Sequence, residues 1–401
     1  MNILIVEPEI NGHHIVMYVR FLIRGLIKKN INFSILTSKK IKEHKSLDIL
    51  REEKKKIKFY FLDDLEYPKK KNPISLLFFQ ISNYFKIKKG FETINKKEKF
   101  DYIFLTTLDH IDKVVPFFGS PFGKNKFSSI ILNPKNHLNK YKLAQFNFKK
   151  FIYDFNIKKI LKLNYLENLF SNDPLFVQYI KTKYINHSKK IHYFEEPVEL
   201  NYLKKDNTAK KELKFNSKDF VILIYGAIKN SKSVTDLIQI LQKKNLKKNI
   251  KVLLCGVQTN EIKDFLKQKK CINLIRENKL KIINKFLNLR EEGRVFSASD
   301  LVWIVYKEGS FGSSGVLFLA KKSKKPIITS KSGIPYWFNK RFMLGPSIDI
   351  NNQKQVIKIL NKLSYKSSFY NKYKKNIILK SRDNYVKKFY LNILNTLNFF
   401  K

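Results

Sequence analysis

The sequence predicts an α/β protein made of two doubly wound domains in tandem. Apolar strand patterns alternate with helical stretches in both halves of the chain, which is typical of a parallel sheet with helices on both faces. The alternation stops after Pro197 and restarts at Phe220, and 401 residues are enough for two cores. We expect an N-terminal domain over 1–198, a C-terminal domain over 199–382, and a final helix over 383–401 that joins the first domain.

The strand patterns of the first half are short apolar runs. They are expected at 2–6, 32–36, 101–105, 128–132 and 191–194. Residues 15–28 carry apolar side chains at helical spacing, which predicts a helix. The aromatic stretch 73–89 ends in lysines and permits two interpretations, a helix packed on the sheet or a segment lying in a membrane interface.

The second half repeats the alternation. Strands are expected at 220–225, 251–255, 301–306 and 326–329. Helices are expected at 234–242, after Gly312 and at 383–399, and a helical region is expected between the second of these strands and residue 289.

The formal charge of +47, from 80 Lys plus Arg against 33 Asp plus Glu, permits three interpretations. A nucleic-acid-binding protein uses such charge on phosphates, and a peripheral membrane enzyme uses it on anionic lipid heads. The third is compositional drift, because Lys, Asn, Ile, Phe and Tyr share A/T-rich codons. Only eight of the basic residues are arginine and the lysines are spread along the chain, which disfavours a base-reading surface. As explanations of the positive charge, we therefore rank compositional drift first, attraction to a membrane second and nucleic-acid binding last.

Several classes of protein are disfavoured by what the sequence lacks. The two cysteines, Cys255 and Cys271, match no metal spacing, and no Walker loop or nucleophile elbow is present. The first residues lack the basic start and long apolar core of a signal peptide, and no uncharged apolar run reaches the roughly 20 residues that cross a bilayer. We expect a cytoplasmic protein without a metal or cofactor, with the inner membrane surface as a candidate partner.

A small-residue segment in the second half predicts an anion site. The segment 311–320, FGSSGVLFLA, follows the strand pattern that ends at Tyr306. Its small residues are Gly312, Ser313, Ser314 and Gly315. They open a helix, where free backbone N–H groups and the positive end of the helix dipole favour a phosphate or diphosphate.

A second loop indicates the same chemistry. Gly226 follows the strand pattern at 220–225, and Lys229 and Lys232 lie in the loop before the next helix. In a doubly wound sheet, ligands bind beyond the carboxyl ends of the strands, where two lysines can neutralise a diphosphate. Lysine occurs in almost every loop of this chain, so the combination with Gly226 and the downstream small residues carries the prediction.

The order of these motifs resembles the C-terminal domain of family-4-like glycosyltransferases of the GT-B fold. The loop 226–233, GAIKNSKS, resembles their donor-diphosphate loop, and Lys232 falls on its lysine. The segment 298–306 resembles the pattern before their donor loop, GSSG resembles the loop itself, and 326–330 resembles the strand that follows. The resemblance covers roughly residues 218–350 and implies two Rossmann-like domains that face a central cleft.

The sequence differs from the resembled family at two positions where those enzymes often carry carboxylates. These enzymes often carry two glutamates eight residues apart that contact the donor sugar and the ribose, and Phe311 and Leu319 stand at those positions here. Ser233 also replaces a usual glycine, and Ala227 stands where an arginine often sits. Glu308 lies nearby and is a candidate replacement for the first glutamate. The alternative is therefore an inactive GT-B module that binds a nucleotide or a partner transferase.

The first loop of the chain, EPEINGHH, resembles the glycine-containing first loop of the same enzymes, with Asn11 in place of one glycine. Gly12 allows a close backbone approach, and His13 or His14 can hydrogen-bond a sugar hydroxyl or a phosphate. A solvent-exposed histidine pair is the alternative.

A second polar loop follows the strand expected at 101–105. Asp109 and His110 occupy this loop and are candidates for holding the acceptor or the donor sugar. A helix N-cap is the alternative role for Asp109.

Together, the motifs and the resemblance imply a retaining glycosyltransferase that uses a nucleotide-diphosphate sugar without a metal and acts on a glycan or lipid-linked acceptor in surface polysaccharide synthesis. The expected donor-binding residues are Gly12, Gly226, Lys229, Lys232, Glu308, Gly312, Ser313, Ser314 and Gly315, and the expected catalytic residues are His14, Asp109, His110 and Lys232. The inactive module is the first alternative, and a basic nucleic-acid-binding protein is the second.

Overall fold

The computed structural model divides into two compact units, Met1–Pro197 with Asn384–Lys401, and Val198–Asp383. We call them the N-terminal unit and the C-terminal unit. The structure describes residues 1–10, 14–44, 46–65, 67–68, 72–141, 147–200, 206–307, 312–381 and 385–397. The site candidates Gly12 and Glu308, together with His13 and Phe311, lie outside these ranges.

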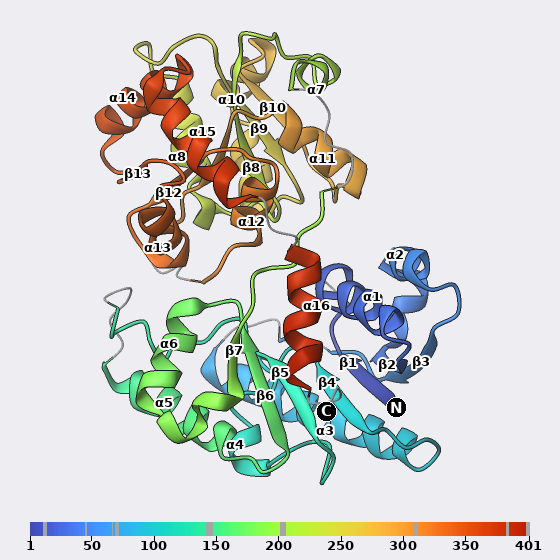
Figure 1. Ribbon diagram of the computed structural model, residues 1–401. Coiled ribbons are helices and arrows are strands. Elements are labelled where there is room, and N and C mark those ends of the chain that lie inside the picture. Colours follow the sequence, from blue (N-terminus) through green and yellow to red (C-terminus); the bar gives the residue numbers. More distant parts are fainter. Residues whose placement is uncertain are drawn as a thin grey trace. The chain divides into compact units, whose positions relative to one another are not determined.

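The N-terminal unit is built on a parallel sheet (Figure 1). Among the described residues its strands are β1 (Asn2–Glu7), β2 (Asn32–Ser38), β3 (Lys58–Leu62), β4 (Tyr102–Leu105), β5 (Phe127–Ile130), β6 (Leu166–Ser171) and β7 (Ile191–Tyr193). Their order is β3-β2-β1-β4-β5-β6-β7. β1 lies between β2 and β4, with Glu7 opposite Thr37 and Val6 opposite Leu105, so the carboxyl ends of these three strands meet at one edge.

Helices cover both faces of this sheet, because successive strand side chains point to opposite faces. Ile3 and Ile5 of β1 belong to one core, whereas Leu4 and Val6 belong to another. The first core is closed by a π-helix (Ile15–Val19), α1 (Arg20–Lys28), α2 (Ser46–Glu53) and α16 (Tyr385–Thr396). The second is closed by α3 (Pro73–Asn95), α4 (Val115–Phe118), α5 (Asn147–Leu161) and α6 (Pro174–Lys183).

Helix α3 combines a buried and an exposed apolar face. Pro73 is its first residue, and Asn72 and Ser75 form a reciprocal capping box. Tyr84, Ile87 and Phe91 pack in the core, which confirms the packed-helix interpretation, while apolar side chains on the other face stay exposed. Despite its length, neither α3 nor any other helix in the described ranges is apolar enough over a sufficient stretch to cross a membrane.

The C-terminal unit repeats the design with a second parallel sheet. Its described strands are β8 (Phe220–Tyr225), β9 (Ile250–Cys255), β10 (Leu280–Ile283), β11 (Leu301–Ile304), β12 (Ile327–Ser330) and β13 (Ser347–Ile348), in the order β10-β9-β8-β11-β12-β13. Its helices are α7 (Asp206–Glu212), α8 (Val234–Leu241), α9 (Asn260–Leu266), α10 (Lys269–Arg276), α11 (Leu289–Ala298), α12 (Gly315–Lys322), α13 (Gly333–Phe342), α14 (Gln353–Ser364) and α15 (Ser368–Lys380). The expected tandem of two doubly wound α/β units is therefore confirmed.

The expectation of a purely helical region up to residue 289 is wrong, because β10 lies inside it. β10 is a four-residue edge strand that pairs on one side, with β9, and three of its side chains are half-buried. A strand of four residues has too few alternating apolar and polar positions to be recognised from the sequence. β3, β6 and β13 were likewise not expected from the sequence, and β3 and β13 are also strands at the edge of a sheet.

The C-terminal helix α16 packs on α1 across a glycine. A Cβ atom placed on Gly25 would lie 2.7 Å from Tyr390 Cβ, closer than such atoms approach. Phe389, Ile393 and Leu394 of α16 are buried in the same core. Gly25 is therefore required by the close approach of the two helices.

We expect the Gly25→Ala substitution to lower the free energy of unfolding by about 1–3 kcal/mol, because Tyr390 must shift in a filled core. Gly90→Ala in α3 is the matched control, since its Cβ would meet Leu62 Cβ at an ordinary 3.5 Å. That change should stabilise the helix by about 0.5–1 kcal/mol. Urea unfolding of both variants measures the difference, and equal midpoints would show that α1 and α16 are not tightly packed.

Candidate active site

A first candidate site lies at the carboxyl edge of the C-terminal sheet, where two glycines meet. Gly226 follows β8 with φ +90°, and Gly256 follows β9 with φ +132°. A Cβ atom on Gly256 would lie 1.8 Å from the Gly226 carbonyl oxygen. Both positions therefore need glycine, the first for its backbone conformation and the second also for the close approach. Gly256 was not singled out from the sequence, although a glycine directly after a buried strand was the available signal.

Lys232 reaches back to this glycine pair. It ends a 3₁₀ turn, Asn230–Lys232, and its Nζ donates a 2.6 Å hydrogen bond to the Tyr225 carbonyl oxygen. A Cβ on Gly226 would lie 3.3 Å from Lys232 Nζ and 3.9 Å from Val316 Cγ2. The structure thus brings the lysine, Gly226 and the first turn of α12 together.

Burial lowers the pKa of Lys232 to about 8, and the charge of Lys229 lowers it further in the same direction. Lys229 itself is exposed. The loop that carries both lysines is held by β11, because Trp303 Nε1 donates to the Lys232 carbonyl oxygen at 3.1 Å and the Lys307 N–H donates to the Ser231 carbonyl oxygen at 2.9 Å. A fixed, partly desolvated ammonium group attracts an anion strongly.

The start of α12 presents the expected small residues. The helix begins at Gly315 with Ser314 as its N-cap, and Ser314 makes no side-chain capping hydrogen bond. Ser314 Oγ instead lies 2.9 Å from the Tyr306 hydroxyl. Ser313 Oγ is buried without a hydrogen-bond partner among the described residues, and Gly312 is exposed. The first N–H groups of the helix are therefore not capped by a side chain and suit a phosphate.

Further buried polar atoms at this edge lack partners within the part of the chain that the structure describes. They are Ser233 Oγ, Gln258 Nε2 and Thr259 Oγ1, on the loops after β8 and β9. Buried polar groups are nearly always hydrogen-bonded. A polar ligand at the carboxyl edge would supply the missing partners.

A buried carboxyl group at the start of α11 was missed from the sequence. Glu292 hydrogen-bonds Tyr225, and burial raises the pKa of Glu292 to about 7 despite that hydrogen bond. Tyr225 ends β8, directly before Gly226. A glutamate in the first turn of a helix is ordinary, so only the fold shows that this one lies beside the lysine loop.

A second candidate site lies at the carboxyl edge of the N-terminal sheet. Glu7 ends β1 and is fully buried, where it accepts hydrogen bonds from Thr106 Oγ1 at 2.6 Å and from the Glu9 N–H at 2.9 Å. His14, directly before the π-helix, has Nδ1 3.5 Å from Glu7 Oε2. His110 Nε2 lies 2.9 Å from Glu9 Oε2. The two expected histidines are thus brought together, and two glutamates join them.

Asp109 links two loops. Its carboxylate accepts hydrogen bonds from the N–H groups of Leu132 and Asn133, each at 2.8 Å, and from Thr107 Oγ1 at 3.2 Å. These bonds join the loop after β4 to the loop after β5. Asp109 is therefore positioned to hold His110 in place, and it caps none of the described helices.

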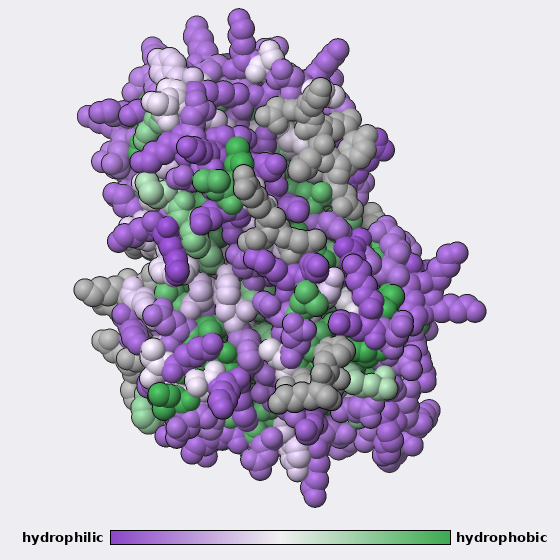
Figure 2. All heavy atoms as spheres, in the orientation of Figure 1, coloured by the Kyte–Doolittle hydropathy of each residue, from purple (hydrophilic) through white to green (hydrophobic). Residues whose placement is uncertain are grey.

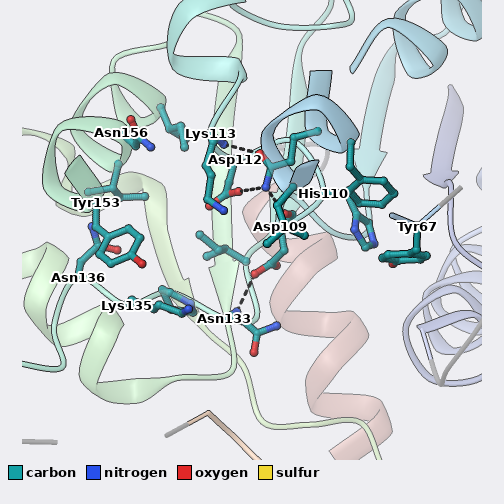
Figure 3. A pocket seen from close by; sticks show the side chains of 17 residues that line it. Tyr67, Asp109, His110, Asp112, Lys113, Asn133, Lys135, Asn136, Tyr153 and Asn156 are labelled. Atoms are coloured by element: carbon teal, nitrogen blue, oxygen red, sulfur yellow. Dashed lines mark hydrogen bonds between the residues drawn. The ribbon is translucent and has the colours of Figure 1, made fainter. Parts of the chain in front are cut away.

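A pocket of about 290 Å³ adjoins Asp109 and His110 (Figure 3). Its lining combines amide side chains, charged groups and aromatic rings. They include Gln80, Asn133, Asn136, Asn156, Asp112, Lys113, Lys135, Tyr67, Phe79 and Tyr153. Amides and carboxylates can hydrogen-bond several hydroxyl groups at once, while aromatic rings pack on C–H faces. The lining can therefore hydrogen-bond a polar ligand and pack against its apolar faces.

The ionisable groups at this edge of the sheet change one another's pKa. Burial alone would lower the pKa of His14, but Glu7, Glu9 and Asp109 outweigh it and raise the pKa to about 9. The pKa of His110 rises for the same reason, chiefly through Glu9. Burial raises the pKa of Asp112 to about 6, and the charge of Asp109 adds to that shift. The edge therefore groups two imidazoles of raised pKa with several carboxylates.

Comparison with known proteins gives structural matches only. No protein-family model matches the chain, and no curated protein sequence matches it. HepE of Anabaena in complex with UDP is 14% identical with a TM-score of 0.67, over 99% of each chain. WaaG, a glycosyltransferase involved in lipopolysaccharide biosynthesis, is 11% identical with a TM-score of 0.62, over 98% of each chain. The chain has the GT-B fold. UDP-GlcNAc 2-epimerase of Neisseria meningitidis, bound to UDP-GlcNAc, shares it at 13% identity with a TM-score of 0.61, over 99% of each chain.

Because an epimerase is among the matches of this GT-B protein, the fold alone does not decide the reaction. The structure places Gly226, Lys232 and the α12 start in one group, and His14, Asp109 and His110 in another. The first group lies in the C-terminal unit and the second in the N-terminal unit.

Proposed function

We propose that this protein is a glycosyltransferase that moves a sugar, with retention of configuration, from a nucleotide-diphosphate donor to a glycan or lipid-linked acceptor. The observation that carries the proposal is the desolvated Lys232 beside Gly226 and the uncapped first turn of α12. A buried ammonium group at a helix start is suited to a diphosphate. HepE, which shares the fold, binds UDP.

In this proposal the donor diphosphate lies against Lys232, Lys229, Ser313 and Ser314. As the bond between the sugar C1 and the phosphate oxygen breaks, negative charge grows on that oxygen, and the Lys232 ammonium with the α12 N–H groups stabilises it. The acceptor hydroxyl attacks C1 on the same face, and its proton passes to the departing phosphate oxygen. No metal ion is needed for the leaving group, because the lysine supplies the positive charge.

The acceptor is assigned to the N-terminal unit in this proposal. His14 and His110 would hydrogen-bond sugar hydroxyl groups, Asp109 would position His110, and the 290 Å³ pocket would hold a sugar ring. The lipopolysaccharide role of WaaG, which has the same fold, supports a surface glycan as the product class.

An anionic membrane surface is the proposed location of the acceptor. Aromatic side chains on α3, α4 and α5 are exposed and touch one another: Phe85 packs on Phe118, and Phe117 packs on Phe155, with ring centroids 5.7 and 6.1 Å apart. Lys159 Nζ lies 5.6 Å from the centroid of the Phe155 ring, in a chain of net charge +47. The face drawn in Figure 2 is largely hydrophilic between scattered apolar groups. Exposed aromatic rings beside lysines favour an interface with anionic lipids.

A screen of nucleotide sugars tests the proposal. UDP, GDP or ADP sugars should raise the unfolding temperature, and a fitting nucleotide at about 100-fold its Kd should add about 2.7 kcal/mol of stability. Mass spectrometry of the products then separates transfer to an acceptor from hydrolysis and from epimerisation. A sugar epimer as the sole product would replace the transferase proposal with an epimerase.

A second candidate function is an inactive module that binds a nucleotide. It is favoured by Leu319, an almost buried apolar side chain in α12 where the resembled enzymes often carry a ribose-binding glutamate. Stabilisation by a nucleotide without any turnover would support this candidate over the enzyme.

A further inference from the structure

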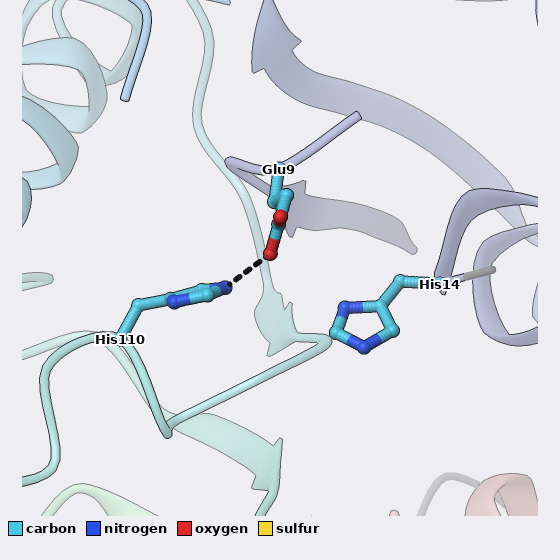
Figure 4. Close-up of side chains that lie close together, drawn as sticks. All are labelled: Glu9, His14 and His110. Carbon is cyan, nitrogen blue, oxygen red and sulfur yellow. Dashed lines mark ion pairs between the residues drawn. The ribbon is translucent and has the colours of Figure 1, made fainter. Parts of the chain in front are cut away.

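Three potential metal ligands meet at the carboxyl edge of the N-terminal sheet. One donor atom each from Glu9, His14 and His110 lies within 4.8 Å of the other two, and Glu9 Oε2 is 2.9 Å from His110 Nε2. Figure 4 shows both imidazole rings beside the Glu9 carboxylate. Glu9 and His14 lie five residues apart in the first loop, whereas His110 lies in the loop after β4, so no single ligand spacing along the sequence relates all three.

We propose that Glu9, His14 and His110 bind one divalent transition-metal ion of the zinc type. Two imidazole nitrogens and one carboxylate oxygen form a ligand set that zinc accepts, at bond lengths of about 2.0–2.2 Å. Ligand atoms of a tetrahedral site with those bonds lie about 3.3 Å apart. The observed separations of 2.9 Å to at most 4.8 Å lie on both sides of that value, so the three side chains must shift to complete the site.

The charges around the three ligands favour a cation. The negative charges of Glu7, Glu9 and Asp109 favour a positive charge at the position of His14. Glu7 is fully buried and fixed by Thr106 and the Glu9 N–H, so its charge stays close to His14. The chain as a whole has a net charge of +47, yet three carboxylates gather at this one edge of the sheet. Such a local group of negative charges attracts a cation.

The ligands are held by fixed elements. Glu9 follows β1 and His14 directly precedes the π-helix. His110 lies next to Asp109, whose carboxylate joins the loops after β4 and β5. The rings of Tyr67 and Phe79 stand nearly perpendicular to the His110 ring, with centroids 6.2 and 6.3 Å away. A π-helix is a rare element that occurs often at functional sites. Fixed ligands reduce the entropy that metal binding costs.

The three ligands would leave a fourth coordination position for a small molecule. His110 also lines the 290 Å³ pocket, so water or a sugar hydroxyl could take that position from the pocket side. This inference goes beyond the proposed donor site, since the diphosphate is assigned to Lys232 in the C-terminal unit. It changes the proposed role of His14 and His110, which would reach an acceptor hydroxyl through the bound ion instead of directly. Metal binding can be present or absent whether or not the chain transfers a sugar.

The test is titration of the metal-stripped full-length protein with Zn²⁺ by calorimetry and with Co²⁺ by visible absorption. We expect one ion per chain and the intense visible bands of four-coordinate Co²⁺. His110→Ala and the isosteric Glu9→Gln should each weaken binding by at least about 10-fold. His187→Ala removes an imidazole from another part of the unit and should leave the affinity unchanged.

Three outcomes would overturn the inference: no binding at one equivalent, binding that survives both site substitutions, or binding that His187→Ala weakens as much as His110→Ala does. Thermal unfolding of each metal-free variant shows whether it is folded. Nucleotide binding, measured on the same samples, reports on the proposed donor site separately, because Glu9→Gln leaves the C-terminal unit untouched.

Discussion

Replacing Lys232 with alanine should reduce kcat/KM for sugar transfer by about 10²–10³-fold. Lys232 is the positive group that the structure holds nearest to Gly226 and the start of α12, and its ammonium is partly desolvated. Removal of one preorganised group that stabilises developing charge typically costs that factor, because water would have to reorganise to take its place. Steady-state kinetics with the donor identified by the nucleotide screen measure the loss.

Two further variants make the result specific to this lysine. Lys358→Ala removes an exposed lysine from α14 and should leave kcat/KM unchanged, which excludes a general effect of net charge. Lys229→Ala removes the exposed neighbour and should have a smaller effect than Lys232→Ala. Full activity of Lys232→Ala would contradict the donor-site assignment, whereas a loss of turnover with unchanged nucleotide affinity would show that the lysine acts only in the transition state.

Nucleotide binding should weaken above about pH 8. Burial and Lys229 lower the pKa of Lys232 to about 8, so the free protein loses this positive charge as the pH rises through that value. A bound diphosphate favours the charged lysine and raises its pKa. Binding above about pH 8 must therefore include proton uptake, and Kd should rise by up to about tenfold per pH unit, whereas an ordinary lysine would cause no change until about pH 10.

Calorimetry from about pH 7 to about pH 10, in buffers of different ionisation enthalpy, counts the protons taken up. Lys232→Arg is the control, because a guanidinium group keeps its charge over this range and its Kd should stay flat. A flat profile for the wild-type protein would mean that Lys232 does not contact the phosphate.

The candidate site of the C-terminal unit was largely predictable because its residues are close in sequence. Gly226 and Lys232 share one short loop, and the small residues from Gly312 to Gly315 form the start of one helix. Each signal depends on local geometry, a strand followed by glycine and a helix that opens with small residues. Glu292 gave no such signal, because its burial against Tyr225 depends on how α11 packs.

The candidate site of the N-terminal unit was predictable only as a list of polar residues. His14, Asp109 and His110 were expected at strand ends, but Glu7 and Glu9 were not singled out as partners. The hydrogen bonds of Asp109 to the Leu132 and Asn133 N–H groups join loops after two different strands. No spacing rule along the chain relates such residues.

The sequence by itself determined the fold class, the tandem arrangement and the lysine–glycine loop, since apolar periodicity and glycine placement act over a few neighbouring residues. Only the tertiary structure decided that β10 is a strand, that Gly256 must lie against Gly226, and that Glu9, His14 and His110 meet. The physical reason is the order of the strands in the sheet. Because β4 pairs with β1, loops that are far apart in the chain lie at one edge of the sheet, where their charged groups interact.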